Sequence, residues 1–171
     1  MTKWLSAVDA AYLRIERQGT PMHGGQLMVF RKPVGAPAGW LTSVFAALHG
    51  SPIDRPPFNW RLARRFGRPT WQVDPSPDPN HHIRLWALQG GGDWSALHDL
   101  VLDLHIRPLD PARPLWECHM IDGLGTDRFA VYFRVHHAPM DGTGFLAFLH
   151  RWLTVDPSYV DEAAPWSAKP G

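Results

Sequence analysis

The sequence predicts an α/β sandwich in which helices flank a mixed β-sheet. Segments with helical and with strand-like spacing of apolar residues alternate irregularly along the 171 residues. That order favours a mixed sheet over a strictly doubly wound fold. Seventeen prolines punctuate the chain, so the elements between them should be short. Hydrophobic residues make up 44% of the chain, which is enough for one packed core.

Four helices are predicted from apolar residues that recur every three or four positions. Their spans are residues 6–17, 39–49, 93–106 and 143–154. The first should begin at Ser6, which can form a capping box with Asp9. The apolar faces are Leu5, Val8, Tyr12 and Ile15 in the first helix, Trp94, Leu97, Val101 and Leu104 in the third, and Phe145, Phe148, Leu149, Trp152 and Leu153 in the last.

Four strands are predicted, at residues 22–30, 82–88, 116–121 and 128–136. The last two are joined by a short turn with two glycines. Between residues 51 and 79 prolines are dense, so irregular structure with one or two short strands is expected. The basic run Arg61–Arg68 in this segment is typical of a solvated face, and the alternative is contact with the phosphates of a nucleotide-bearing substrate.

Composition excludes several classes of protein. The net charge is +1 with scattered Lys and Arg, so no nucleic-acid partner is expected. The single cysteine, Cys118, excludes a disulfide within the chain. No apolar run suits a secretory signal or a membrane span, so a soluble cytoplasmic protein is expected. Of the nine tryptophans, most should lie in the core, and a few could line an apolar channel or rest at a lipid surface.

The end of the last strand carries the candidate chemistry. Side chains alternate along a strand, so Phe129, Val131, Phe133, Val135 and then His137 should share one face. Arg134 and His136 should lie on the other face, which means that only one of the adjacent histidines serves a given cavity. Pro139 ends the strand, and Gly142 permits a backbone turn that other residues resist. Asp141 could brace the loop, cap the following helix or orient an imidazole.

Three interpretations of the histidines compete on the residues alone. They can be structural, as most histidine pairs are. They can bind a metal, since His81, His82, His119, His136 and His137 are available, although no pair has zincin spacing and Cys118 has no cysteine partner at ligand spacing. The third interpretation is general-base catalysis, because an imidazole with a pKa of ~6.5 accepts a proton near neutral pH.

The motif His136–Gly142 resembles the HHxxxDG signature of the CoA-dependent acyltransferases, a superfamily with a chloramphenicol acetyltransferase-like fold that includes the condensation domains of peptide synthetases. Further motifs across the chain narrow the resemblance to the bacterial wax ester synthase/diacylglycerol acyltransferases, of which this chain resembles the N-terminal half. They are Leu5–Glu16, Pro21–Gly25, Pro108–Asp110, Arg113–Glu117, Gly123–Leu124 and Pro165–Trp166.

The resemblance implies roles for particular residues. His137 corresponds to the general base that takes a proton from a fatty alcohol or diacylglycerol, whose oxygen then attacks the thioester of acyl-CoA directly. His136 corresponds to a structural neighbour, Asp141 to a loop brace, and Gly142 to the turn. Pro114, Leu115 and Trp116 match a Pro-Leu-Trp motif that we expect to pack at the substrate channel. No metal and no cofactor are implied, because acyl-CoA is a substrate.

The resemblance also implies a second domain. Residues 1–155 should form the N-terminal acyltransferase domain, and residues 156–171, which are rich in Pro and Ala, the start of an interdomain linker. A C-terminal acyltransferase domain is then an expected partner, beside acyl-CoA, a lipid alcohol, and contact with a membrane or lipid droplet. Two alternatives stay open: a condensation-type acyltransferase that uses a carrier-protein thioester, against which the Pro-Leu-Trp and Met-His-Gly-Gly matches argue, and a non-catalytic half-domain that binds lipid or a partner.

Overall fold

A four-stranded sheet organises the structure, which is a computed structural model that describes residues 2–17, 20–89, 92–154, 156 and 163–168. The strand order is β2–β7–β6–β5. β5 pairs parallel with β6, and the other two pairs are antiparallel, so the predicted mixed sheet is confirmed. The strands are β2 (His23–Arg31), β5 (Ile83–Ala87), β6 (Trp116–Leu124) and β7 (Arg128–His136).

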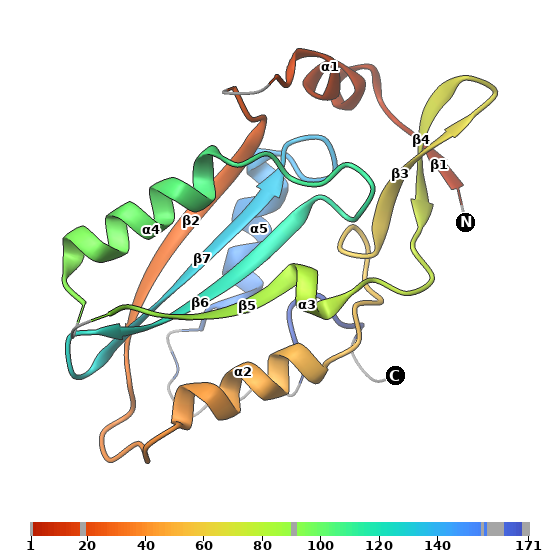
Figure 1. The fold of residues 1–171 in the computed structure, drawn as a ribbon. Helices are drawn as coiled ribbons and strands as arrows, with labels where there is room; N and C mark the ends of the chain where they lie inside the picture. Colours follow the sequence, from red (N-terminus) through yellow and green to blue (C-terminus); the bar gives the residue numbers. More distant parts are fainter. Residues whose placement is uncertain (1, 18–19, 90–91, 155, 157–162, 169–171) are drawn as a thin grey trace.

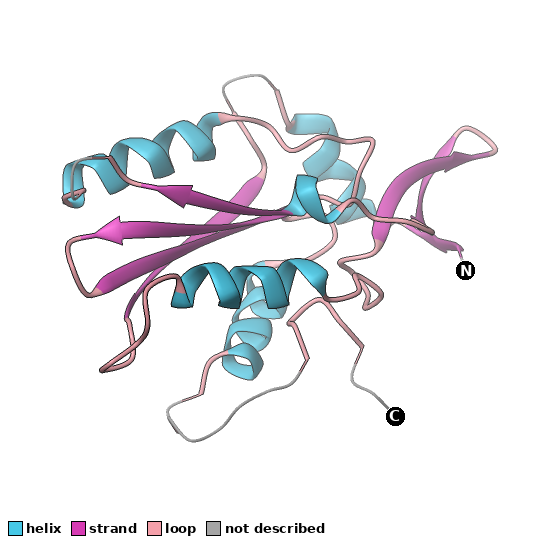
Figure 2. Cartoon of the chain, turned by 60° about the horizontal axis from the view of Figure 1, so that its bottom comes forward, coloured by secondary structure: helices cyan, strands magenta, loops and turns pink. Residues whose placement is uncertain are grey.

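Helices cover both faces of this sheet, which confirms the α/β sandwich (Figure 1). α4 (Trp94–Ile106) lies on one face, and α2 (Trp40–Gly50) and α5 (Gly142–Trp152) lie on the other (Figure 2). The main core forms between the sheet and the second pair of helices. α4 forms a smaller cluster with Ile121, Leu124, Ala130 and Tyr132. Burial on both faces explains why β7 is buried almost along its whole length.

A second, three-stranded sheet has the order β1–β4–β3. Its strands are β1 (Thr2–Trp4), β3 (Trp60–Arg65) and β4 (Arg68–Val73). Figures 1 and 2 show that this sheet projects from the body of the domain, beside α1 (Ala7–Ile15). The β3–β4 hairpin falls in the segment expected to hold one or two short strands. β1 and the single-turn α3 (Pro79–His82) were not expected.

The predicted helix spans are confirmed to within a few residues, but parts of their predicted faces are wrong. α1 has the expected capping box, because Ser6 Oγ accepts from Asp9 N–H (3.0 Å) and Asp9 Oδ2 accepts from Ser6 N–H (3.1 Å). Val8 is nevertheless 62% exposed, and Ile15 is exposed too. The other half of the predicted face is confirmed, because Leu5 and Tyr12 pack against the body, together with Leu13.

Two other apolar residues predicted to be buried are exposed. Trp94 is the first residue of α4, with 56% of its surface exposed. Leu153 follows the last residue of α5 and is also exposed. Both lie at the ends of their helices. Among the described residues, no helix is long and apolar enough to cross a membrane.

Residues from Asp156 onward were expected to start a linker, and the end of this segment packs on the domain. Trp166 is fully buried and stacks on Trp116, with ring centroids 5.2 Å apart. Its carbonyl accepts from Arg55 N–H (3.1 Å), and Ser167 Oγ donates to the Pro52 carbonyl (2.6 Å). Residues 164–167 therefore belong to the folded domain, whereas residues 157–162 lie outside the described part of the chain.

Candidate active site

The histidine pair lies where β7 ends beside β2. His136 is opposite His23 in the register of these strands. The predicted alternation is confirmed for the strand itself: Phe129, Val131, Phe133 and Val135 face the main core. Arg134 faces the other way and donates to the Leu104 carbonyl at the end of α4 (2.6 Å). The chain then leaves the sheet at His137, which begins the turn before α5.

His136 is completely buried and held by three groups. Its Nδ1 accepts from Ala138 N–H (3.0 Å), and its own backbone N–H donates to the Leu115 carbonyl (3.0 Å). Since Nδ1 accepts, the proton of the neutral ring is on Nε2, which lies 3.5 Å from Glu16 Oε2. Burial lowers the pKa of His136, while the Glu16 carboxylate acts in the opposite direction. A buried ring with these contacts serves to hold the turn.

Glu16 connects the histidine pair to the first helix. Its Oε1 accepts from Met22 N–H (3.1 Å), and the Met22 carbonyl accepts from His137 N–H (2.9 Å). A single carboxylate thus lies between the C-terminal end of α1, the start of β2 and the histidine turn. No local pattern predicted this role of Glu16, because 120 residues separate it from His136.

His137 lines a cavity of about 360 Å³. Its ring stacks on Tyr12 of α1 (centroids 5.2 Å apart, planes at 27°). On another side the ring lies over Gly24, where an added Cβ would be 3.7 Å from Cε1. The rest of the cavity wall is polar and aromatic, and it includes Lys3, Asp9, Pro57, Trp60, Trp71, Asp141 and Arg151. Of the two adjacent histidines, only His137 therefore reaches an open cavity.

Asp141 caps the helix that follows the motif. Its Oδ1 accepts from Gly144 N–H (2.7 Å) at the first turn of α5. Gly142 is the first residue of α5 and does not have a positive φ. A Cβ added there would meet nothing within 4 Å, so the expectation that Gly142 provides a turn reserved for glycine is wrong. Gly142 instead lines a small pocket of about 30 Å³, to which His137 also contributes.

The Pro114-Leu115-Trp116 segment packs beneath the motif. Trp116 is buried, stacks on His82 (4.6 Å) and Trp166, and donates from Nε1 to the Phe58 carbonyl (2.8 Å). Leu115 lies in a small cluster with Trp71 and Ala138. These residues are not among the described residues that line the His137 cavity. They contact the site through the Leu115 carbonyl, which accepts the hydrogen bond from His136 N–H.

A buried ion pair joins the strands on the α4 side of the sheet. Arg134 Nη2 donates to Glu117 Oε2 (2.8 Å), and His119 Nε2–H donates to the same oxygen (2.9 Å). Burial alone would raise the pKa of Glu117, but the hydrogen bond from His119 and the charge and hydrogen bond of Arg134 hold it at about 2. Glu117 therefore stays ionised and holds the side chain of Arg134, which precedes the histidine pair by two residues in the sequence.

The histidines considered as metal ligands are distributed over the structure. His82 Nδ1–H donates to the Trp116 carbonyl (2.8 Å), and His119 is engaged with Glu117. In the part of the chain that the structure describes, no group of three or more His, Cys, Asp or Glu is placed to hold a metal ion. Cys118 is buried, which raises the pKa of its thiol to about 12.

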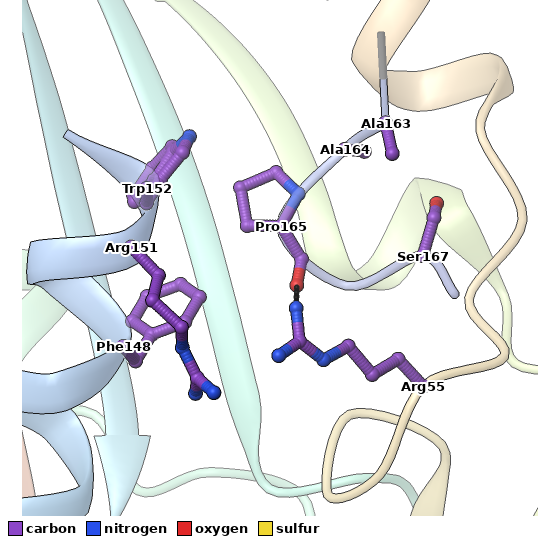
Figure 3. A pocket seen from close by; sticks show the side chains of 8 residues that line it. All are labelled: Arg55, Phe148, Arg151, Trp152, Ala163, Ala164, Pro165 and Ser167. Carbon is purple, nitrogen blue, oxygen red and sulfur yellow. Dashed lines mark hydrogen bonds between the residues drawn. The ribbon is translucent and has the colours of Figure 1, made fainter. Parts of the chain in front are cut away.

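A second cavity, of about 150 Å³, lies between α5 and the tail (Figure 3). Phe148 and Trp152 line one side, and Ala164 and Pro165 the other. Figure 3 shows the guanidinium of Arg55 against the Pro165 carbonyl, to which it donates (3.4 Å). Arg151 lines both this cavity and the His137 cavity, so the two are neighbours along α5.

Comparison with known proteins shows the family to which the chain belongs. The model of the wax ester synthase/diacylglycerol acyltransferase catalytic domain matches residues 5–171. The chain belongs to this family. A putative diacylglycerol O-acyltransferase of Mycobacterium tuberculosis is 40% identical over 168 residues, which are 98% of this chain and 37% of that protein. The O-acyltransferase WSD of Acinetobacter baylyi is 34% identical over 163 residues, 95% of this chain and 35% of that protein.

Solved structures extend the comparison to the fold. The wax ester synthase/diacylglycerol acyltransferase from Marinobacter aquaeolei VT8 superimposes with a TM-score of 0.92 at 34% identity, over 97% of this chain and 40% of that chain. The starter condensation domain of rhizomide synthetase gives a TM-score of 0.66 at 17% identity, over 87% of this chain and 35% of that chain, a likeness of fold alone. The chain thus spans about two fifths of the length of these wax ester synthase/diacylglycerol acyltransferase relatives.

Proposed function

We propose that the chain is the histidine-bearing part of an O-acyltransferase that transfers a fatty acyl group from acyl-CoA to a fatty alcohol or diacylglycerol. The observation that carries this proposal is the unequal placement of the two histidines. His136 is buried and braced, while His137 lines a cavity of about 360 Å³. The names of the relatives, diacylglycerol O-acyltransferase and wax ester synthase, support the substrate classes.

In this mechanism, His137 is the general base. Its neutral imidazole takes the proton of the alcohol as the oxygen attacks the thioester carbonyl, and the imidazolium returns that proton to the sulfur as CoA leaves. No acyl-enzyme is formed. The stacking on Tyr12 restricts the ring of His137, and the hydrogen bond from its backbone N–H to the Met22 carbonyl fixes the turn that carries it. Such restriction favours proton transfer along a fixed line.

Other residues of the motif have supporting roles. Asp141 holds the first turn of α5 through Gly144, and His136 anchors the strand end. The open space at Gly142 leaves room for substrate to approach the base. The Pro114-Leu115-Trp116 segment supports the floor of the substrate channel from below.

We propose further that a C-terminal acyltransferase domain completes the site. The His137 cavity is open, whereas acyl transfer to an alcohol has to exclude water that would hydrolyse the thioester. The relatives are more than twice as long as this chain, which supports a second domain that closes the cavity and stabilises the oxyanion. The assembled enzyme would act in the cytoplasm, in contact with a membrane or lipid droplets.

The test is ester formation from radiolabelled acyl-CoA and either hexadecanol or diacylglycerol, by this chain alone and together with a complementary C-terminal acyltransferase polypeptide. In the active form, His137→Ala should lower the rate by ~10²–10⁴ while acyl-CoA still binds. His136→Ala is the matched control: it should lower the free energy of unfolding, because a buried anchor is lost. Ordinary turnover by His137→Ala, or a requirement for added metal, would overturn the mechanism.

A further inference from the structure

The tip of the β3–β4 hairpin is built in an unusual way. Arg65 pairs with Arg68 in the register, so Phe66 and Gly67 form a two-residue turn. Both have positive φ, 50° and 74°, as in a type I′ turn, which favours Asn, Asp or Gly at both positions. A phenylalanine with positive φ costs backbone strain. The residue is nevertheless 87% exposed, so it contributes almost no packing within the domain.

Positive charge surrounds this exposed ring. Arg64, Arg65 and Arg68 are exposed, and none of them forms an ion pair with a described residue. Residues 55–73 contain five arginines and no acidic residue. The Arg65 guanidinium lies over Phe66 (5.4 Å to the ring centroid), and that of Arg68 lies over Trp4 of β1 (5.3 Å). Trp4 is a second exposed aromatic residue on the same small sheet.

The hairpin also stands away from the rest of the molecule. Figures 1 and 2 show its tip as the outermost point of the projecting sheet. At its base, Lys3, Trp60 and Trp71 line the His137 cavity. The sheet therefore connects an exposed basic and aromatic tip with the wall of the candidate active site.

We propose that this hairpin tip docks the protein on an anionic phospholipid surface. Phe66 and Trp4 enter the boundary between headgroups and acyl chains, where aromatic rings are favoured. Arg64, Arg65 and Arg68 bind lipid phosphates, and this attraction offsets the repulsion between neighbouring guanidinium groups. A two-residue tip offers a protein partner little contact area, whereas a single ring among arginines suits a lipid interface.

The consequence for activity rests on the proposed function. A tip held in the lipid surface places the cavity lined by Lys3, Trp60 and Trp71 next to the membrane, from which a lipid alcohol could reach His137 without crossing water. The docking itself does not depend on catalysis. Vesicle binding is therefore the readout, so that a failed acyltransferase assay and a failed docking test can be told apart.

The decisive variant is Phe66→Asn, because it separates lipid binding from structure. Asparagine suits the first position of a type I′ turn, so this variant should keep or raise the melting temperature. Its partitioning into sedimented vesicles with about 30% phosphatidylserine, an anionic lipid of the cytoplasmic leaflet, should fall about tenfold, since one aromatic ring no longer inserts. The matched control is Val34→Asn, which removes a fully exposed apolar side chain elsewhere and should bind like the unmodified chain.

The charge contribution is tested with two arginine pairs that face each other across strands. Arg65→Gln/Arg68→Gln should lower partitioning by on the order of tenfold. The control Arg31→Gln/Arg128→Gln removes the same charge from the far end of the β2–β7 ladder. It should change partitioning into vesicles little. Binding should weaken with salt and on phosphatidylcholine vesicles. The proposal would be overturned if the chain did not bind vesicles, or if both arginine pairs lowered binding equally. It would also be overturned if Phe66→Asn bound as well as the unmodified chain, as when another part of the protein covers the tip.

Discussion

Replacement of Trp166 by alanine tests whether the tail belongs to the domain. Trp166 is completely buried and stacks on Trp116, at the centre of the main core. A buried tryptophan removes 150–250 Å² from water, equivalent to about 4–6 kcal/mol at 25 cal/mol per Å². Because the unfolded chain already hides part of this surface and the cavity can partly collapse, we expect a loss of about 3–5 kcal/mol in the free energy of unfolding.

The assay is urea unfolding followed by tryptophan fluorescence and by far-ultraviolet circular dichroism. The matched control is Trp94→Ala, which removes the same side chain from an exposed position at the start of α4 and should cost less than about 1 kcal/mol. Circular dichroism is needed because each variant also loses one fluorophore. If Trp166→Ala unfolded at the same urea concentration as Trp94→Ala, the tail would behave as a linker, and the burial argument would be refuted.

Three further outcomes follow from single contacts and are measured by thermal or urea unfolding. Asp141→Ala should cost about 1 kcal/mol because the α5 cap is lost, whereas Asp141→Asn should be nearly neutral because asparagine caps equally well. Gly25→Ala should cost about 1–3 kcal/mol, since the new Cβ would lie 2.3 Å from Tyr132 Oη; a neutral effect would show that the ring moves freely. Burial, the largest cause, lowers the pKa of His23 and of His82 to about 4. The unfolded chain therefore binds more protons between about pH 6.5 and 4, so stability should fall as the pH drops through that window, and His82→Asn should weaken the dependence.

Local patterns in the sequence were sufficient for most elements. Apolar spacing and capping residues predicted four helices, and the Ser6–Asp9 capping box formed as expected. Alternation along β7 correctly separated Phe133 from Arg134, because successive side chains of a strand point to opposite faces. The same pattern, together with the HHxxxDG resemblance, indicated His137 as the candidate base.

Contacts between distant segments were beyond such patterns. The approach of Glu16 to His136 depends on where α1 docks, and no local signal encodes a pairing across 120 residues. The tail has the composition of a linker, yet Trp166 is buried, because the space beside Trp116 accepts a second indole. Val8 has helical spacing but remains exposed, since α1 covers only a small cluster around Leu115 and Trp71.

The sequence by itself thus determined most of the elements, the mixed sheet and the residue types of the site, because these follow from periodicity, capping and motif along neighbouring residues. Only the tertiary structure decided which histidine reaches a cavity, that Asp141 caps α5, and that the basic run Arg61–Arg68 forms a projecting hairpin with a strained aromatic tip. The physical reason is that burial and charge pairing are properties of neighbours in space. The two histidines are the same residue type side by side in the sequence. In the structure, His136 is enclosed by Glu16 and Ala138, whereas His137 stacks on Tyr12 at the cavity wall.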